Sequence, residues 1–515
     1  MGEQNSKWGR TYTKPLPPDP WTTPLQAKSL KPQCATYPDM LAPNGIEDCL
    51  TLNIIRPAAP SDNSVGYSVM VWIHGGAFVI GSASDYNCSE TAERMVSKGI
   101  IFVSINYRLG PFGFFSTGDL DAPGNYGLWD QVQALKFIQK IIGAFGGNSK
   151  SVTIFGESAG GGSVSWLTLT PEAKDLFARA IPMSGSALAP WAHTDDVIST
   201  SKQLIEETGC EESKNVKKCL KSKSMEEIKK ATAKFARFVL KSDGVNLAAW
   251  HPRIDGEFLH GLTVEQAIVK APKKDHFMGI CGLEHGDSRN TVNGAFNDPE
   301  TKLMPISPKK AANFTRENFA EIVYKILGTK ERYGEKAKEA AEDIIKFYES
   351  QTESYSRNHY IHFYAQLFSD ISFNIPTIRE AQLKAAAGQK VYFYVYNFVP
   401  RKHDLFDGAG HASELSNFFG AIFMPALPLE GNVAKVQKIM VDLFINFAKT
   451  GKPTAENLEV PTLKTPNKTP YIEINENSKI NDDLWADRIE FWETHSKKFG
   501  FDLPQVRKIE KHDEL

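Results

Sequence analysis

The sequence predicts an α/β fold with a large, mostly parallel, twisted central sheet that carries helices on both faces. Short apolar runs rich in β-branched and aromatic residues, such as 69–73, end in glycine or polar residues, which is typical of strands buried on both faces. Between two of these runs, residues 128–138 repeat their apolar positions at helical spacing. Alternation of strand, helix and strand implies a parallel sheet with helices packed against it.

The individual elements follow from the same patterns. Five apolar runs are expected to be strands of the sheet: 69–73, 100–105, 152–155, 277–280 and 391–396. Helices are expected at 128–138 and 161–169, and two stretches rich in Lys and Glu, near 195–245 and 305–350, are expected to be solvated helices around the sheet. No linker rich in Pro, Gly or Ser divides the chain, so residues 1–515 are predicted to form a single domain.

The overall charge argues against a broad cationic surface. The chain has 515 residues, with 59 Lys and Arg against 61 Asp and Glu, and a formal charge of −2. Such a balance offers no basic field for nucleic acid or for an anionic membrane. No apolar run reaches the roughly 18 residues of a membrane-spanning helix, so no transmembrane segment is expected. No CxxC pair and no Cys/His cluster with zinc spacing occur, and a structural metal is therefore not expected.

The two ends of the chain indicate different compartments. The last four residues, 512–515, read His-Asp-Glu-Leu, the HDEL address for retention in the endoplasmic reticulum, whereas the polar and proline-rich residues 1–21 contain no apolar signal-peptide core. A retention address acts only on a protein that has entered the lumen. We therefore expect localisation in the endoplasmic reticulum lumen, an HDEL-retrieval receptor as a partner, and a leader that this sequence lacks. The alternative is an accidental tail.

Cysteines and sequons agree with a secretory route. The six cysteines are Cys34, Cys49, Cys88, Cys210, Cys219 and Cys281. Two pairs are close in sequence, the first two and the fourth with the fifth, and each pair could close a short loop in an oxidising compartment. The alternative is a cytosolic protein with six buried thiols. Candidate glycosylation sequons occur at Asn87, Asn313 and Asn467.

The candidate nucleophile is Ser158. It is the serine of a Gly-x-Ser-x-Gly pattern at 156–160, directly after the strand at 152–155 and at the start of the expected helix. A strand that runs sharply into a helix holds the serine on a tight, strained turn, and the small flanking residues let the backbones approach. The N-terminus of the helix offers backbone N–H groups and a positive dipole end to a developing negative charge.

A base and an acid are expected on other loops at the same edge of the sheet. A serine hydroxyl needs a base to take its proton, and His411 lies in a glycine-rich loop after the strand at 391–396. An acid must orient the imidazole, and Glu284 follows the strand at 277–280, with Asp287 as the alternative acid. The resulting order of nucleophile, acid and base is that of the α/β-hydrolases. The alternative for His411 is a solvent-exposed loop histidine.

Backbone donors for an oxyanion are expected from the loop after the first strand. The sequence His-Gly-Gly-Ala-Phe at 74–78 follows the strand at 69–73. Glycine there frees backbone N–H groups to point at a small anion. The amide of Ala159 would complete the hole. The alternative is a plain glycine turn.

With these motifs, the chain resembles the type-B carboxylesterase and cholinesterase family, whose members have the α/β-hydrolase fold. Residues 47–53 (EDCLTLN) are similar to the EDCLxLN signature of that family, and residues 155–161 (FGESAGG) match its nucleophile signature. Segments 106–110, 124–131 and 447–453 also resemble the family. The likeness extends from about residue 14 to the low 490s.

The resemblance implies a role for each matching residue. Ser158 would be the nucleophile, Glu284 the acid and His411 the base. The amides of Gly76, Ala77 and Ala159 would bind the oxyanion. Gly75 and Glu157 would lie next to these residues, with Glu157 as a buried carboxylate that tunes the charge of the site. The resemblance also implies the disulfides Cys34–Cys49 and Cys210–Cys219.

Three departures from the family pattern are visible. The family begins with a leader and an N-terminal hairpin that have no counterpart here. Glu284 is followed by His285 and Gly286, where the family more often has glycine directly. The loop between Cys34 and Cys49 holds no tryptophan, the residue through which cholinesterases bind a quaternary ammonium, so acetylcholine is not expected as the substrate.

The resemblance and the motifs together predict the hydrolysis of a small carboxylic ester through an acyl-enzyme, without cofactor or metal. One alternative is a non-catalytic adhesion or scaffold protein on the same fold, because fold alone does not fix function. Another is a lipase or thioesterase, which would share the chemistry and differ in the acyl pocket.

Overall fold

A nine-stranded sheet forms the centre of the part of the chain that the structure describes. In this computed structural model the described residues are 12–37, 44–234, 248–286, 311–351, 359–400, 406–422, 427–464 and 468–509. In spatial order the strands are β1 (Leu52–Ile55), β3 (Ile100–Ile105), β2 (Tyr67–Ile73), β4 (Gly147–Glu157), β5 (Arg179–Met183), β6 (Asp275–Cys281), β7 (Lys390–Tyr396), β10 (Tyr471–Ile474) and β11 (Lys479–Asn481).

The sheet is parallel in its middle and antiparallel at both edges. Neighbours from β3 to β10 pair in parallel, whereas β1 pairs antiparallel with β3 and β11 antiparallel with β10. Two small antiparallel sheets lie outside it: β8 (Thr454–Ala455) with β9 (Leu458–Glu459), and β12 (Phe501–Asp502) with β13 (Arg507–Lys508). Parallel strands need covered crossovers, so this sheet has to be covered by helices.

Strand β2 shows that the sheet is buried on both faces. Val69, Val71 and Ile73 belong to one hydrophobic cluster, and the alternate residues Met70 and Trp72 belong to a second cluster. Successive side chains of a strand point to opposite faces of the sheet. The two clusters are therefore the two layers of core above and below the sheet.

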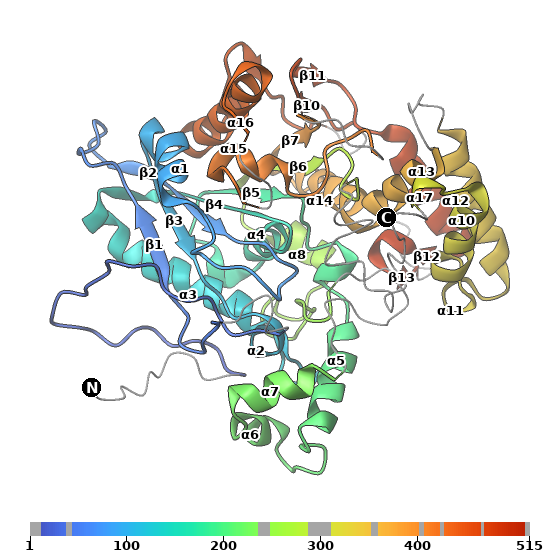
Figure 1. Cartoon of the computed structure of the whole chain (residues 1–515), viewed down its shortest axis with the longest axis horizontal. Coiled ribbons are helices and arrows are strands. Elements are labelled where there is room, and N and C mark those ends of the chain that lie inside the picture. The colour runs from blue at the N-terminus through green and yellow to red at the C-terminus, as the bar shows by residue number, and fades with distance from the viewer. Residues whose placement is uncertain are drawn as a thin grey trace.

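Helices fill each layer. On one face α3 and α4 contribute residues such as Leu128 and Trp166, and on the other α16 contributes Phe444 and Phe447; Figure 1 shows α16 and α3 on opposite sides of the sheet. The α-helices are α1 (Cys88–Arg94), α2 (Gly110–Phe114), α3 (Tyr126–Ile141), α4 (Ala159–Leu169), α5 (Asp196–Glu207), α6 (Val216–Lys221), α7 (Met225–Thr232), α8 (Val264–Lys270), α10 (Arg316–Ile322), α11 (Lys330–Tyr333), α12 (Ala337–Ser350), α13 (His359–Ser369), α14 (Ile375–Ala386), α15 (Ser416–Phe419), α16 (Gly431–Thr450) and α17 (Ala486–Phe499).

Shorter helical turns connect these elements. Two are π-helices, η7 (Val323–Leu327) and η9 (Asp370–Asn374), the second of which joins α13 to α14. The 3-10 turns are η2 (Val96–Lys98), η3 (Ile142–Phe145), η4 (Pro171–Ala173), η5 (Pro190–Ala192), η8 (Gly334–Lys336), η10 (Ser413–Leu415) and η11 (Leu503–Gln505).

The predicted fold class is confirmed, and the five expected strands are present as β2, β3, β4, β6 and β7. The helix expected at 128–138 is α3, and the one expected from residue 161 is α4, which already begins at Ala159. The charged stretches contain α5 to α7 and α10 to α12, while residues 235–245 and 305–310 lie outside the described residues. The single domain over 1–515 stays a prediction.

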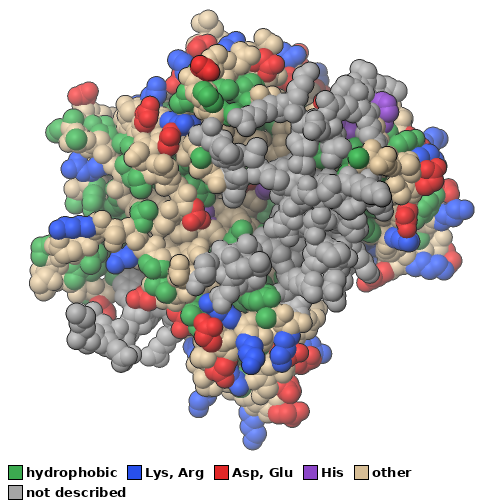
Figure 2. Space-filling view, in the orientation of Figure 1, with side chains coloured by type: hydrophobic (Ala, Val, Ile, Leu, Met, Phe, Trp, Pro, Cys, Tyr) green, Lys and Arg blue, Asp and Glu red, His purple; other side chains and the backbone are tan. Residues whose placement is uncertain are grey.

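Four of the six cysteines form two disulfide bonds. Cys34 is bonded to Cys49 and Cys210 to Cys219, while Cys88 is an exposed free thiol and Cys281 a buried one. On the face in Figure 2, the described Lys and Arg side chains are interspersed with Asp and Glu. Among the described residues no helix is long and apolar enough to cross a membrane.

Candidate active site

Four strands bring the predicted site residues to one edge of the sheet. Strand β2 ends at Ile73, before the 74–78 loop, and β4 ends at Glu157, before Ser158. Strands β6 and β7 lead into the loops that carry Glu284 and His411. Since all four strands are parallel to their neighbours, their carboxyl ends meet at the same edge, where ligands bind in open α/β sheets.

Ser158 lies on the strained turn that its motif predicts. Its backbone has φ 59° and ψ −124° between β4 and α4, a conformation that non-glycine residues rarely adopt. The following Gly160 packs so closely that a Cβ there would lie 2.1 Å from the carbonyl oxygen of Ile73. The glycine is therefore needed for helix α4 to approach β2, and this approach fixes where the serine hydroxyl points.

His411 lies between the predicted nucleophile and the predicted acid. Its Nε2 is 2.9 Å from Ser158 Oγ, and its Nδ1 is 2.6 Å from Glu284 Oε2. The other oxygen of the Glu284 side chain accepts a hydrogen bond from the backbone N–H of Cys281 at 2.8 Å. Glu284 is buried, and because each of its carboxylate oxygens has a partner, the carboxylate is held in one orientation.

Backbone hydrogen bonds hold the acid loop and the base loop together. The N–H of His411 donates to the carbonyl of Glu284 at 3.0 Å, and the N–H of Leu283 donates to the carbonyl of Ala409 at 3.0 Å. At the strand ends, the N–H of Gly282 donates to the carbonyl of Tyr396 at 2.9 Å. The backbone pairing of β6 with β7 therefore continues into the two loops, and it holds the side chains of Glu284 and His411 in contact.

A second carboxylate, Glu157, lies beside the imidazole. Its Oε1 is 3.1 Å from His411 Nε2, and the side chain is almost fully buried. Burial raises the pKa of Glu157 to about 8, with Glu414 and Glu284 adding to the rise and His411 opposing it. Burial lowers the pKa of His411, but the carboxylates of Glu157, Glu284 and Glu414 outweigh it and raise the pKa to about 9.

The glycine loop after β2 runs next to the serine. A Cβ at Gly75 would lie 3.1 Å from the Cβ of Ser158, and the backbone of Gly76 and Ala77 has φ of 106° and 51°. No described residue accepts a hydrogen bond from the N–H of Gly76, Ala77 or Ala159. The oxyanion role expected for these three amides stays a prediction.

His74 anchors this loop to the neighbouring strand. Its ring stacks on Tyr107 with 4.4 Å between the centroids, and the Tyr107 hydroxyl donates to the carbonyl of His74 at 2.8 Å. Burial lowers the pKa of His74 to about 4, against a hydrogen bond to the Gly75 carbonyl. The imidazole is therefore uncharged at neutral pH and adds no cation next to the site.

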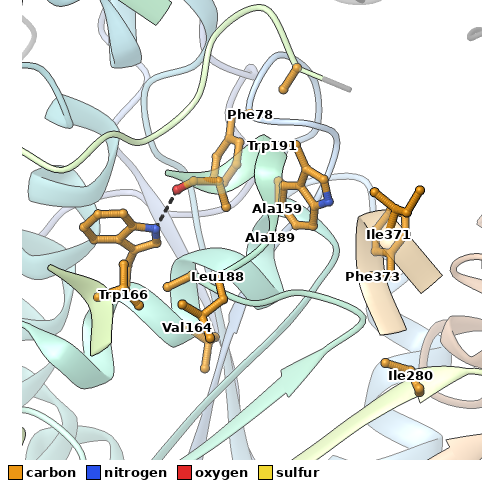
Figure 3. Packing of buried hydrophobic residues seen from close by; sticks show 14 of the residues in the cluster. Phe78, Ala159, Val164, Trp166, Leu188, Ala189, Trp191, Ile280, Ile371 and Phe373 are labelled. Atoms are coloured by element: carbon orange, nitrogen blue, oxygen red, sulfur yellow. Dashed lines mark hydrogen bonds between the residues drawn. The ribbon is translucent and has the colours of Figure 1, made fainter. Parts of the chain in front are cut away.

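Buried aromatic side chains pack in a row that begins at the ring of His411. Phe373, from the π-helix η9, lies 4.6 Å from the ring of His411. Trp191 lies 5.5 Å from Phe373 and 6.1 Å from Phe78, and Figure 3 shows its ring between these two. The Trp191 Nε1 donates to the carbonyl of Ser372 at 2.7 Å. The face of the His411 ring is therefore packed against an apolar cluster.

The sequence analysis missed Glu414, Cys281, Trp191 and Phe373 as neighbours of the site. The sequence offered one signal for two of them, their closeness to predicted site residues: Glu414 follows His411 by three residues, and Cys281 precedes Glu284 by three. Nothing in the sequence indicated that the Cys281 thiol donates to Glu414 Oε2 at 2.9 Å. Trp191 comes from the short 3-10 turn η5, and Phe373 from the π-helix η9, where the helix departs from the α-helical period.

The remaining predicted residues are dispersed. Asn87 and Asn313 are exposed, and Asn87 caps helix α1 by accepting hydrogen bonds from the N–H groups of Ser89 and Glu90. Asn467, the alternative acid Asp287 and the tail 512–515 lie outside the described residues. Among those that are described, no group of three or more His, Cys, Asp and Glu side chains is arranged to hold a metal ion.

Comparison with known proteins gives a consistent result. The sequence model of the carboxylesterase family matches residues 9–492. Gut esterase 1 of Caenorhabditis briggsae is 33% identical over 508 residues, which cover 96% of this chain and 88% of the relative. Bile salt-activated lipase of Rattus norvegicus is 33% identical over 507 residues, covering 94% and 79%. Liver carboxylesterase 1F of the same species is 32% identical over 526 residues, covering 93% and 86%.

Proposed function

Because the chain belongs to the carboxylesterase family, we propose that it hydrolyses carboxylic esters through a Ser158–His411–Glu284 triad and an acyl-enzyme intermediate. Family membership supports serine hydrolase activity on carboxylic esters. The observation that carries the assignment of the triad is the position of one imidazole, 2.9 Å from Ser158 Oγ and 2.6 Å from Glu284 Oε2.

Acylation begins when His411 takes the proton of Ser158. As the hydroxyl proton moves to Nε2, Oγ attacks the carbonyl carbon of the ester. Glu284 holds Nδ1–H and stabilises the imidazolium that forms. The tetrahedral intermediate then breaks its bond to the alcohol oxygen, which takes the proton from Nε2. The alcohol leaves, and the acyl group stays on Oγ.

The amides of Gly76, Ala77 and Ala159 receive the negative oxygen of the tetrahedral intermediate. They are supplied by the loop after β2 and by the first residue of α4, and the proposal is supported by the close approach of that loop to Ser158, where a Cβ at Gly75 would lie 3.1 Å from the serine Cβ. Removing one donor from such a hole raises the barrier by about 3 kcal/mol. Backbone donors fixed before the substrate arrives need little reorganisation during the reaction.

Deacylation repeats the same proton movements with water. A water molecule gives a proton to Nε2 of His411 while its oxygen attacks the acyl carbon. The bond to Ser158 Oγ breaks, Oγ regains the proton, and the carboxylic acid leaves. The steps balance without any oxidant, reductant or metal, and Glu284 supports the imidazolium in both halves of the reaction.

We place this activity in the lumen of the endoplasmic reticulum. Two disulfides, Cys34–Cys49 and Cys210–Cys219, suit an oxidising compartment, and the HDEL tail would bind a retrieval receptor. Deleting residues 512–515 should move the protein from the lumen to the culture medium when it is expressed behind a signal peptide. Unchanged retention after the deletion would refute the role of the tail.

The triad is tested with Ser158→Ala and a fluorophosphonate probe. We expect the wild-type protein to be labelled on Ser158 and to hydrolyse a short-chain nitrophenyl ester, and the variant to lose more than about a thousandfold of that activity. Ser222→Ala, at an exposed serine, is the matched control and should keep both. An unlabelled wild-type protein without esterase activity would instead favour the non-catalytic scaffold.

A further inference from the structure

Cys281, the last residue of β6, connects two carboxylates with its two donors. Its backbone N–H donates to Glu284 Oε1 at 2.8 Å, and its thiol donates to Glu414 Oε2 at 2.9 Å. The residue is fully buried and is not part of a disulfide. A single residue therefore lies between the proposed acid and a second carboxylate that the mechanism above does not use.

Glu414 is fully buried on the same loop as His411. Its Oε1 has no hydrogen-bond partner among the described residues; the groups that donate to its carboxylate are the Cys281 thiol and the backbone N–H of Glu414 itself. Titratable groups face it from every strand nearby; they are Glu157 at the end of β4, Cys281 and Glu284 on and after β6, Tyr394 and Tyr396 on β7, and His411 on its own loop.

The charge on Glu414 matters for the base. Burial, and then Glu284, raise the pKa of Glu414 to about 7, while the thiol hydrogen bond of Cys281 lowers it. Burial and the two carboxylates raise the pKa of the Cys281 thiol, so the thiol stays protonated and able to donate. Ionised Glu414 in turn helps to raise the pKa of His411. The donor thus favours a charge that stabilises the imidazolium.

We propose that Cys281 is a positioning residue for catalysis, whose thiol holds the Glu414 carboxylate ionised beside the triad and thereby strengthens His411 as a base. This role rests on the proposed function. Without the thiol, the buried carboxylate of Glu414 would keep only its own backbone N–H as a donor, and a buried carboxylate that loses a donor takes up a proton more readily. The imidazolium that forms during acylation would then lose one of its stabilising charges.

The test is the pH dependence of fluorophosphonate labelling and of kcat/KM for a nitrophenyl ester. Cys281→Ala and Cys281→Val both remove the donor, and valine also fills the space that alanine leaves. His411 must be neutral to act, so a lower His411 pKa moves the acidic limb of both profiles to lower pH. We expect a shift of roughly half a unit to one unit, the size of a weak hydrogen bond to a charged group, and a lower plateau.

Three further variants make the result specific. Cys281→Ser keeps a donor and should return the limb towards its wild-type position. Cys88→Ala, at the exposed free thiol, should leave both profiles unchanged. In a Glu414→Gln background, which should itself shift the limb to lower pH, removing the thiol should produce no further shift.

Two results would overturn the proposal. One is a Cys281→Val profile that superimposes on that of the wild type, and the other is a thiol effect of full size in the Glu414→Gln background. In either case, a wild-type protein that is labelled and a Ser158→Ala variant that is not would leave the proposed function intact. Absence of labelling in the wild type would count against the proposed function itself.

Discussion

The Nε2 atom of His411 lies 3.1 Å from Glu157 Oε1 and 2.9 Å from the Ser158 hydroxyl. When the imidazole is protonated, its Nε2–H can donate to either oxygen. When it is neutral, Nε2 is an acceptor for the serine proton and faces an oxygen of Glu157 without a hydrogen between them. Burial raises the pKa of Glu157 to about 8 against the opposing effect of His411, whereas Glu157, with Glu284 and Glu414, raises the pKa of His411 to about 9 against the effect of burial.

Glu157→Gln should therefore move the acidic limb of kcat/KM to lower pH and reduce kcat. The amide cannot carry the negative charge that helps to raise the pKa of His411, and loss of about 1.4 kcal/mol of imidazolium stabilisation corresponds to about a tenfold lower rate. Steady-state kinetics from pH 5 to about 10, the range that brackets a shifted histidine, provide the measurement. Glu211→Gln at an exposed position is the control, and an unshifted limb in Glu157→Gln would contradict the expected coupling.

The wild-type enzyme should have an acidic limb well above the ordinary histidine range. The base must be unprotonated to accept the serine proton, and the pKa of His411 is raised from 6.5 to about 9. Activity should then rise with pH through the neutral and mildly alkaline range, because the fraction of neutral imidazole grows. A kcat/KM profile that is already flat at pH 6 would exclude a raised histidine pKa in the free enzyme.

Gly160→Ala should inactivate and destabilise the protein. Its Cβ would lie 2.1 Å from the Ile73 carbonyl oxygen, so α4 and Ser158 would have to move, and overpacking of this kind destabilises by about 1–3 kcal/mol or more. Gly143→Ala is the matched control, because a Cβ there meets no atom within 4 Å. Urea unfolding and esterase activity separate the two variants; equal behaviour would refute the steric argument.

Removing one partner of the buried ion pair between Lys384 and Glu380 should destabilise the fold more than removing the charge of both. The two side chains are 2.7 Å apart and fully buried on α14, and the other Glu380 oxygen accepts from the N–H of Ala187. Lys384→Met alone should cost about 3–5 kcal/mol, because it leaves an unpaired buried charge. The double variant Lys384→Met/Glu380→Gln should lose less than the sum of the single losses.

An exposed pair provides the comparison for that measurement. Lys338 and Glu342, 3.7 Å apart on α12, are largely solvated, and such pairs contribute little to stability. Lys338→Met should therefore leave the denaturant midpoint almost unchanged. Additive losses in the Lys384 and Glu380 variants would indicate that the two residues act independently.

The buried parallel strands could be predicted because their sequences are continuous apolar runs. Strand β3 was expected at 100–105 and is found at Ile100–Ile105. Strand β5 was not expected, because it spans only five residues and contains Pro182. Proline is rarely found inside a central strand, since it cannot donate a hydrogen bond to the neighbouring strand. The edge strands β1 and β11 have three or four residues each, and such lengths carry no reliable period.

The site divides in the same way. Ser158 and the glycine loop could be found because their geometry is local, a turn between a strand and a helix. Glu284 and His411 could be proposed because each lies in a loop after an expected strand, but whether they meet depends on strand order across the sheet, which no local pattern gives. Glu414, Cys281 and Phe373 could not be predicted, because their contacts with the triad depend on how β6, the loop after β7 and the η9 turn pack against one another.

Because β5 lies between β4 and β6 in the sheet, the recovery of enzymatic activity during folding depends on the assembly of the central strands. Ser158 follows β4, and its two proposed partners follow β6 and β7, so the three side chains can meet only after β5 has been inserted in register between β4 and β6, which are more than a hundred residues apart in sequence. Contacts of such high sequence separation form slowly. During refolding from denaturant, recovery of nucleophile labelling should consequently lag behind the return of helical signal.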